Sequence, residues 1–142
     1  MKSIIIANWK MNPASLAQAK KLFNSIKRGL KNIRKVEVVI CPPFLYLKEL
    51  SSSLLKLGAQ NCFWEKIGAY TGEVSVLMLK DLGCQYVIVG HSERRKLGET
   101  DEQINKKLKA IIDAKMTPIL CIGETKEQRE KDETKNVLEK QI

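Results

Sequence analysis

Short apolar runs alternate with amphipathic segments along the chain, and this alternation limits the possible folds more than any other feature of the sequence. Five apolar runs begin near residues 4, 36, 59, 86 and 117. The segments between them carry apolar residues at helical spacing, which is the pattern of βα units on a parallel sheet. A βα-barrel and an open doubly-wound sheet both fit. No GxGxxG or GxxxxGK[ST] motif follows a run, which disfavours the nucleotide-binding open sheets.

The runs and the spacing between them predict five strands and five helices. The strands are expected over 4–7, 36–41, 59–62, 86–90 and 117–122. The helices are expected over 15–30, 44–57, 76–82, 100–114 and from 125 toward the C-terminus, and three of them begin with capping boxes: Ser15/Gln18, Thr100/Gln103 and Thr125/Gln128. We interpret Gly58 as the end of the second helix. The intervening loop at 63–73 is long enough to be functional or to form an interface.

The chain is strongly basic, with 25 Lys and Arg against 16 Asp and Glu and a net charge of +9. Such a surplus suits nucleic acid or an anionic small molecule. However, the lysines are spread over the predicted helices, and neither an RNP-like aromatic motif nor a zinc finger accompanies them. We therefore expect a solvated basic surface and no nucleic-acid partner.

The length, the cysteines and the hydropathy of the chain limit the number of domains and the classes of protein to which it can belong. The 142 residues suit one domain, here 1–142. The four cysteines form no CxxC motif and the chain has one histidine, so we expect no metal site. We interpret the cysteines as buried apolar residues. A disulfide framework in a secreted protein is the weaker alternative. No apolar run approaches the roughly 20 residues that span a bilayer, and the first six residues resemble a strand more than a signal peptide. We expect a cytoplasmic protein without a membrane partner.

The single histidine, His91, lies where parallel α/β folds place their chemistry. The apolar run at 86–89 ends at Gly90, and His91 follows it at the carboxyl end of the predicted strand. Ser92 and Glu93 are suited to begin a helix, whose positive end would favour a neutral imidazole able to donate a hydrogen bond. The alternative is a strand end with a charged turn and no chemical role.

Five longer motifs point to a family. They are Ala-Asn-Trp-Lys-Met-Asn at 7–12, Gly-Ala-Tyr-Thr-Gly-Glu at 68–73, Gly-His-Ser-Glu-Arg-Arg at 90–95, Gly-Glu-Thr-Asp at 98–101 and Ile-Leu-Cys-Ile-Gly-Glu-Thr at 119–125. In their sequence, order and spacing, the chain resembles the triose-phosphate isomerase family. The resemblance implies a (β/α)8 barrel that interconverts dihydroxyacetone phosphate and glyceraldehyde 3-phosphate, in glycolysis and gluconeogenesis, without a cofactor.

The resemblance also implies roles for individual residues. Lys10 would attract the substrate phosphate and the developing enediolate oxygen, and Asn8 would hydrogen-bond the substrate and support that lysine. His91 would donate a hydrogen bond to the substrate carbonyl, and Glu93 would pair with Lys10. In the family, a loop corresponding to five residues here reaches into a neighbouring subunit: Ala69, Tyr70, Thr71, Gly72 and Glu73.

Residues 1–142 also depart from the family pattern. The family's catalytic base is a glutamate in an Ala-Tyr-Glu-Pro-Val-Trp-like motif after the sixth strand, followed by a lid loop and two glycine-rich phosphate loops, and none of these occurs here. Leu97 replaces a usual aromatic residue. Glu99 and Glu124 are the nearest carboxylates, but the family gives neither the role of base. A complete barrel has eight units, so we expect an incomplete, open TIM barrel of about five parallel strands, inactive on its own.

An open barrel leaves two unpaired sheet edges and one half-lined inner face. We therefore expect a homo-oligomer, formed by edge pairing, by packing of open faces or through the loop at 69–73. A second polypeptide that supplies strands 6 to 8 is the other expected partner, with a small phosphorylated triose as substrate of the completed site. The alternative function is a non-catalytic oligomeric fragment or an anion-binding module.

Overall fold

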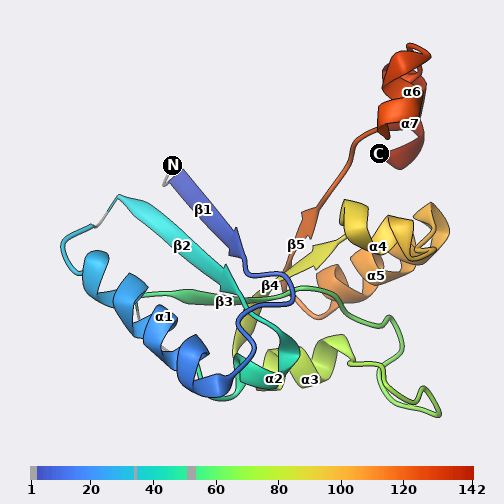
Figure 1. Ribbon diagram of the computed structural model, residues 1–142. Helices are drawn as coiled ribbons and strands as arrows, with labels where there is room; N and C mark the ends of the chain where they lie inside the picture. Colours follow the sequence, from blue (N-terminus) through green and yellow to red (C-terminus); the bar gives the residue numbers. More distant parts are fainter. Residues whose placement is uncertain (1–2, 34, 51–53) are drawn as a thin grey trace.

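The strands follow one another across the sheet in the order of the chain. The computed structural model describes residues 3–33, 35–50 and 54–142. Five strands form one parallel sheet in the order β1-β2-β3-β4-β5: β1 (Ser3–Asn8), β2 (Val36–Cys41), β3 (Lys56–Ala59), β4 (Cys84–Val89) and β5 (Thr117–Leu120). The sheet curves into an open half-barrel with β1 and β5 at its edges (Figure 1). The predicted fold class, an incomplete TIM barrel of parallel strands alternating with helices, is confirmed.

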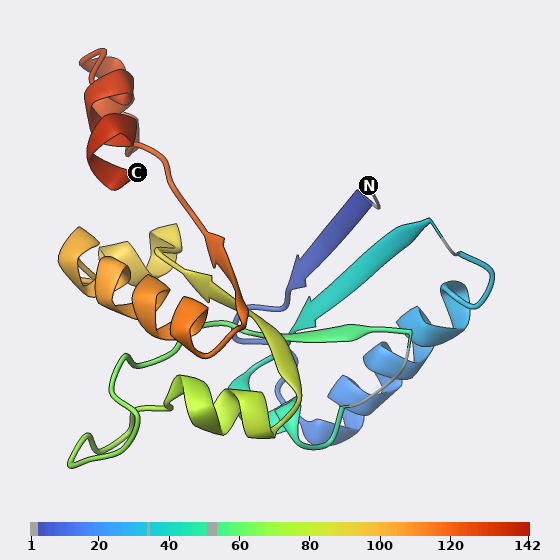
Figure 2. The same ribbon diagram turned by 180° about the vertical axis from the view of Figure 1, so that it is seen from behind.

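Seven helices connect or follow the strands in the described ranges: α1 (Leu16–Gly29), α2 (Phe44–Leu47), α3 (Val76–Asp81), α4 (Ser92–Lys96), α5 (Asp101–Asp113), α6 (Lys126–Glu130) and α7 (Thr134–Gln141). The capping boxes of Thr100 and Thr125 are formed in full. At Ser15 the hydroxyl accepts from the N–H of Gln18 at 3.3 Å, which is the first half of the predicted box. Helices α6 and α7 stand beyond the end of β5, away from the other helices (Figure 2).

The prediction of one long helix over 44–57 and a strand over 59–62 was wrong. Helix α2 covers only Phe44–Leu47, residues 51–53 of the predicted helix lie outside the described residues, and the third strand is Lys56–Ala59. The leucines at 47, 50 and 57 have helical spacing, but each is buried separately, in a short helix, a turn and a strand. Gly58 lies inside β3, where an added Cβ would be 2.5 Å from the Sγ of Cys41. It permits close packing of the sheet and does not end a helix.

The two faces of the sheet carry separate cores. The outer face packs against the helices in a large buried cluster that includes Ala19, Phe23, Ile40, Leu79, Val89 and Ile111. The inner face carries a small buried cluster of Val39, Cys41 and Ile88, flanked by the partly buried Tyr86, Ile119 and Cys121. The core between the sheet and the helices is therefore extensive, while the core on the inner face of the sheet is small.

The cysteines lie in these cores as expected. Cys41, Cys62 and Cys84 are buried free thiols, and Cys121 is partly buried. Burial raises the pKa of the Cys41 and Cys62 thiols to about 12. They behave as small apolar residues that remain protonated at neutral pH.

Candidate active site

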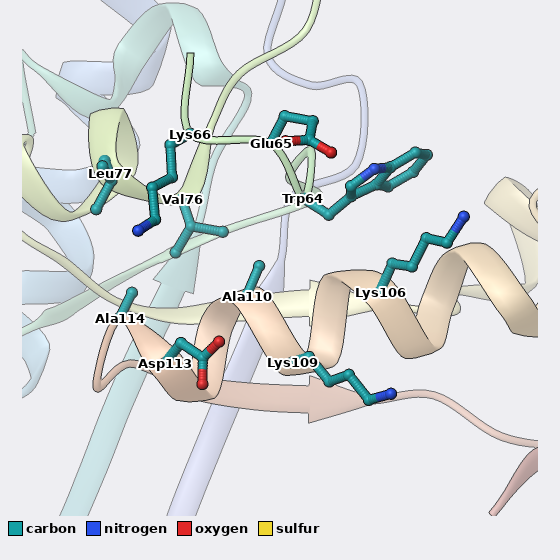
Figure 3. Close-up of a pocket in the computed structure, with 10 residues that line it drawn as sticks. All are labelled: Trp64, Glu65, Lys66, Val76, Leu77, Lys106, Lys109, Ala110, Asp113 and Ala114. Carbon is teal, nitrogen blue, oxygen red and sulfur yellow. The ribbon is translucent and has the colours of Figure 1, made fainter.

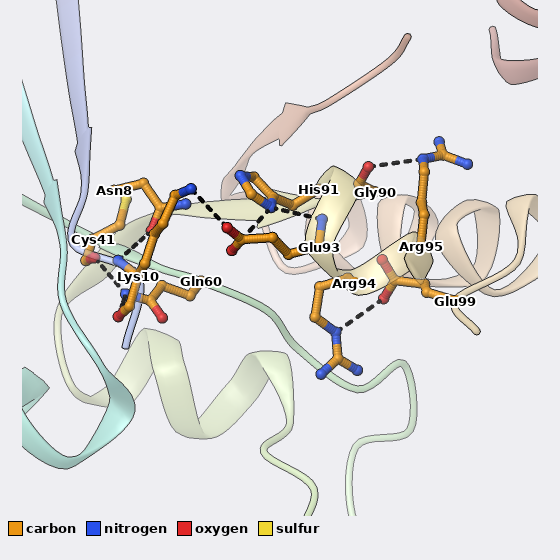
Figure 4. A network of polar contacts seen from close by, with 10 residues as sticks. All are labelled: Asn8, Lys10, Cys41, Gln60, Gly90, His91, Glu93, Arg94, Arg95 and Glu99. Carbon is orange, nitrogen blue, oxygen red and sulfur yellow. Dashed lines mark hydrogen bonds and ion pairs between the residues drawn. The ribbon is translucent and has the colours of Figure 1, made fainter. Parts of the chain in front are cut away.

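The carboxyl ends of β1 and β4 bring four polar side chains together at one mouth of the half-barrel (Figure 4). Asn8 is the last residue of β1, and Lys10 follows two residues later. His91 and Glu93 follow the end of β4, at Val89, across the turn formed by Gly90. Because the carboxyl ends of parallel strands meet at the same edge, residues 83 positions apart become neighbours.

Lys10 is held at three points. Its backbone has a φ of 55°, in the left-handed region that residues other than glycine rarely adopt. Its N–H donates to the Oδ1 of Asn8 at 2.9 Å, and its carbonyl accepts from the Nε2 of Gln60 at 2.8 Å. Its ammonium donates to the Oε1 of Glu93 at 2.6 Å. These bonds hold the strained backbone and place the positive charge at the mouth of the half-barrel.

His91 caps the N-terminus of α4, which begins at Ser92 as predicted. Its Nδ1 accepts a hydrogen bond from the N–H of Glu93 at 3.2 Å. A nitrogen that accepts carries no proton, so the neutral ring carries its proton on Nε2. The side chain is 22% exposed. The ring is thus oriented as a neutral hydrogen-bond donor through Nε2.

Glu93 balances the charge of Lys10. The hydrogen bond from the Lys10 ammonium holds the pKa of the Glu93 carboxyl below its ordinary value, with smaller contributions from the charges of Lys10 and Lys96. Glu93 is therefore ionised at neutral pH. Both partners of the pair are about half exposed, so a ligand can approach the ammonium from solvent.

Two further residues that the sequence did not single out position this site. The Nε2 of Gln60 donates to the carbonyls of both Lys10 and Cys41, each at 2.8 Å. The Nε of Arg95 donates to the carbonyl of Gly90 at 2.8 Å, and its Nη1 pairs with Asp101. Gln60 directly follows the end of β3, so it lies at the same edge of the sheet as Lys10 and His91. The sequence prediction placed Gln60 inside a strand over 59–62, and its position at a strand end was therefore missed.

A hollow of about 330 Å³ lies beside His91, lined by residues that follow β4 and β5: Gly90, Ser92, Arg95, Cys121, Ile122, Gly123 and Glu124. Glu124 is paired with Arg129 at 2.7 Å, and hydrogen bonds from its own backbone N–H and from Arg129 lower its pKa. The other candidate carboxylate, Glu99, is buried against the ammonium of Lys107. Each is engaged by a cation elsewhere, and neither joins the Lys10–Glu93 cluster.

The loop at 63–75 is built on stacked aromatic rings. The ring centroid of Phe63 lies 4.1 Å from that of Trp64 and 4.7 Å from that of Tyr70. The N–H of Phe63 also donates to the carbonyl of Val74 at 2.8 Å, closing the base of the loop. Its tip is exposed and consists of the predicted interface residues Ala69, Tyr70, Thr71, Gly72 and Glu73. Their role in an interface stays a prediction.

A larger hollow, of about 550 Å³, lies on the outer side of the sheet between α3, α5 and the start of the loop, away from Lys10 and His91 (Figure 3). Its lining includes the apolar side chains of Val76 and Ala110, with Trp64 at one end. The charged lining residues have both signs: Glu65, Lys66, Lys106, Lys109 and Asp113. Because this mixture selects no ligand charge, the candidate site remains the mouth of the half-barrel.

Among residues 3–33, 35–50 and 54–142, no three His, Cys, Asp or Glu side chains form a group that could hold a metal ion. In the same ranges, none of the helices has the length and apolar character needed to cross a membrane.

Comparison with known proteins identifies the family. A family model described as triosephosphate isomerase matches residues 3–142. The triosephosphate isomerases of Dictyoglomus turgidum and Alkaliphilus oremlandii are 50% and 51% identical to 99% of this chain, and that of Aquifex aeolicus is 48% identical to all of it. The matches cover 58%, 58% and 59% of those proteins, so the chain spans somewhat over half their length. The chain belongs to the triosephosphate isomerase family.

Proposed function

We propose that this chain supplies the carbonyl-polarising half of a triose-phosphate isomerase site, which interconverts dihydroxyacetone phosphate and glyceraldehyde 3-phosphate. The observation that carries the proposal is the 2.6 Å contact between the ammonium of Lys10 and the carboxylate of Glu93 beside the oriented ring of His91. It places a cation and a neutral donor at one strand-end mouth, as binding of an anionic carbonyl substrate requires.

The proposed chemistry follows from the charges of the substrate. The Lys10 ammonium attracts the phosphate and the developing negative oxygen, and Asn8 supports it through the 2.9 Å bond to its backbone. The Nε2–H of His91 donates to the carbonyl oxygen and withdraws electron density from the carbon–oxygen bond. A base then takes a proton from the neighbouring, hydroxyl-bearing carbon to give an enediolate. The hydroxyl proton passes from one oxygen to the other, and return of a proton to the former carbonyl carbon gives the isomeric triose phosphate.

Among the described residues, the three carboxylates nearest the proposed site are each engaged by a cation and are not proposed as the base. Glu93 is paired with Lys10, Glu124 with Arg129 and Glu99 with Lys107. We propose that the base, the lid loop and the phosphate loops belong to three further βα units, on the same or a second polypeptide. The 142-residue chain alone is therefore expected to show no significant isomerase activity.

Complementation tests this proposal. The 142-residue chain is co-expressed with the remaining C-terminal part of the Dictyoglomus turgidum relative, and formation of glyceraldehyde 3-phosphate is followed with each part alone and with both. Turnover is expected only with both parts, and Lys10→Met in this chain is expected to remove it. Near-normal turnover by this chain alone would contradict the need for a separate base.

A folded complex without turnover would reject the isomerase proposal. The alternative, an anion-binding module, predicts that the chain binds inorganic phosphate at Lys10 and that the added part changes nothing. Chemical-shift changes at Lys10 and His91 on titration with phosphate, measured beside the activity, separate these two results.

The partners of the chain are also proposals. Besides the triose substrate and the polypeptide with strands 6 to 8, we propose that the exposed loop tip at 69–73 contacts a second subunit, supported by its aromatic base and its exposure. A role in glycolysis and gluconeogenesis would place the chain in the cytoplasm.

A further inference from the structure

The net charge of the chain is concentrated in its first residues. Residues 1–36 contain nine Lys and Arg side chains and no Asp or Glu, whereas residues 37–142 contain 16 basic and 16 acidic side chains. The lysines are spread over the whole chain, but the carboxylates begin only at Glu37. The entire surplus of +9 therefore belongs to the first 36 residues. Such an asymmetry within one chain is typical of proteins that bind a polyanion.

Helix α1 presents most of these cations to solvent. Five exposed basic residues lie on the helix or in the turn that follows it, and we call them the basic face of α1: Lys20, Lys21, Lys27, Arg28 and Lys31. The opposite side of the helix packs against the sheet through the buried Ala19 and Phe23. The helix runs along the outer side of the half-barrel in both views (Figures 1 and 2). The basic face therefore points away from the sheet.

The position of the basic face is set by βα units within the described chain. The ammonium of Lys20 donates to the Oε2 of Glu49, just after α2, at 2.6 Å, so this flank of α1 lies beside the second unit. Lys27 is seven residues further along and lies on the same flank, because seven residues are close to two helical turns. Lys21 and Arg28 are also seven residues apart and form a second row, one residue further round the helix toward solvent. Further βα units would leave both rows in place.

Most charges of the basic face have no partner within the fold. Lys20 pairs with Glu49, whereas in the part of the chain that the structure describes no carboxylate pairs with the other four residues of the face. Lys27 and Arg28 lie in the last turn of α1, where the helix dipole favours a positive charge. Lys21, in the middle of the helix, has no such stabilisation. Like charges on neighbouring turns repel one another, and a bound polyanion would relieve that repulsion.

We propose that the basic face of α1 binds the phosphate backbone of double-stranded RNA. Lysine and arginine side chains bind phosphates without regard to sequence, and the release of counterions drives the association. Because one side of α1 is buried against the sheet, only its outer half can enter a groove. The minor groove of an RNA duplex is wide and shallow, and phosphates border it, so a half-embedded helix can lie across it. The deep, narrow major groove of the same duplex does not admit such a helix.

Two other polyanions suit the basic face less well. An amphipathic helix that binds a membrane inserts its apolar side between the lipids, but the apolar side of α1 is buried in the core. Single-stranded nucleic acid is usually bound by stacking its bases on aromatic side chains. The one aromatic residue of α1 is Phe23, which is 3% exposed. The basic face therefore offers charge without insertion or stacking, as the backbone of a duplex requires.

The proposal departs from the expectation of no nucleic-acid partner, which weighed the spread of the lysines and not that of the carboxylates. It is independent of the proposed isomerase function. The basic face lies on the outer side of the half-barrel, whereas Lys10 and His91 lie at its mouth.

The salt dependence of RNA binding tests the proposal. Binding of the 142-residue chain to a labelled RNA duplex of about 20 base pairs is followed by fluorescence anisotropy. We expect a dissociation constant of about 1 to 100 µM at about 50 mM salt. A plot of the logarithm of the association constant against that of the salt concentration should have a slope of about −3 to −4, as about four phosphate contacts require. Absence of binding at about 1 mM protein would reject the proposal.

Two matched double variants separate the basic face from the net charge. Lys21→Gln with Lys27→Gln removes two charges from the basic face, and is expected to weaken RNA binding at least about fivefold and to reduce the salt slope by about 2. Lys106→Gln with Lys109→Gln removes two exposed lysines of α5. This control lowers the net charge equally and is expected to change the affinity less than about twofold. Equal weakening by both would assign the binding to net charge and overturn the proposal. Unchanged thermal unfolding checks that both variants are folded.

Two competing ligands test the choice of RNA. A DNA duplex of the same length is expected to bind more weakly than RNA, because its minor groove is narrow. Vesicles that contain phosphatidylserine are expected to bind more weakly still. Equal binding of the DNA duplex would contradict the argument from the shape of the groove, and tighter binding of the vesicles would assign the basic face to a membrane. Either result would overturn the assignment to double-stranded RNA.

Discussion

The ammonium of Lys10 lies 2.6 Å from the carboxylate of Glu93, although 83 positions separate the two residues in the sequence. The contact joins the loop after β1 to the short helix after β4, across the whole mouth of the half-barrel. Because Glu93 also donates its N–H to His91, one residue orients both the proposed cation and the proposed electrophile. The five strands therefore suffice to assemble this half of the site.

The first prediction concerns the pKa of Glu93. The bond from Lys10 lowers this pKa, so the pair stabilises the fold above the ordinary carboxyl pKa of about 4.3, and this contribution is lost as the pH falls through the lower folded value. Titration followed by carboxyl ¹³C NMR is expected to give a pKa below that of a free glutamate. In Lys10→Met the pKa should rise toward the ordinary value. An identical pKa in both proteins would contradict the pairing.

The second prediction concerns Gln60, whose amide donates to the carbonyls of Lys10 and Cys41. Gln60→Ala leaves both carbonyls without this donor and is expected to lower the free energy of unfolding by about 1 to 2 kcal/mol. It should also release the strained backbone of Lys10, seen as a shift of the Lys10 amide resonance. Gln18→Ala on the exposed face of α1 is the control, with an expected change below about 0.5 kcal/mol in urea denaturation.

The third prediction concerns the buried pair of Lys107 and Glu99, whose side chains are 5% and 2% exposed. Lys107→Met leaves the carboxylate buried without its partner, and a loss of about 3 kcal/mol or more is expected. Adding Glu99→Leu should restore most of that loss, since neither charge of the pair then remains. Only Arg94, whose Nε lies 3.8 Å from Glu99 and whose side chain is 43% exposed, then loses a partner. A double variant less stable than Lys107→Met would argue against this explanation.

A control for the buried pair is available on the surface. The ammonium of Lys126 lies 3.7 Å from Glu130 on α6, with the two side chains 83% and 64% exposed. Lys126→Met is expected to change the free energy of unfolding by less than about 0.5 kcal/mol. The comparison is made by urea denaturation, at one pH and salt concentration, of the wild type, the Lys107→Met variant, the double variant with Glu99→Leu, and the Lys126→Met variant.

The fourth prediction uses two glycines in contrasting surroundings. At Gly58 an added Cβ would lie 2.5 Å from the Sγ of Cys41 and 3.1 Å from Val39, so Gly58→Ala is expected to cost about 1 to 3 kcal/mol. At Gly29, the last residue of α1, an added Cβ meets nothing within 4 Å. Gly29→Ala is expected to raise the stability by up to about 1 kcal/mol. Thermal unfolding of the two variants beside the wild type should move the midpoint in opposite directions.

Most of the fold was predictable because the apolar runs and the capping residues agree. The strands beginning near 4, 36, 86 and 117 correspond to β1, β2, β4 and β5, and the helix cap at Thr100 lies where the sequence places it. The prediction of the third strand and the helix before it was wrong because the leucines at helical spacing continue into β3. In that strand, Gly58 is required for close packing against Cys41. Spacing alone does not distinguish a continuing helix from a turn whose apolar residues are buried one by one.

The residues of the candidate site were predictable from the sequence, but the interactions that hold them in position were not. His91 follows a recognisable strand end, whereas the roles of Asn8, Lys10 and Glu93 came from the family resemblance. The structure brings the four together. The left-handed backbone of Lys10 and the hydrogen bond to it from Gln60 arise only in the tertiary structure. They depend on how β1, β2 and β3 are staggered along one another in the sheet.

The spatial order of the strands is also the order in which a ribosome makes them. Each strand from β2 onward pairs with the strand synthesised just before it, so none of the five waits for a later segment to form its first ladder. The sheet can therefore grow one βα unit at a time during translation, with the helices covering its outer face as they emerge. By the time β4 has joined the sheet and α4 has formed, the partners of Lys10 are already in place.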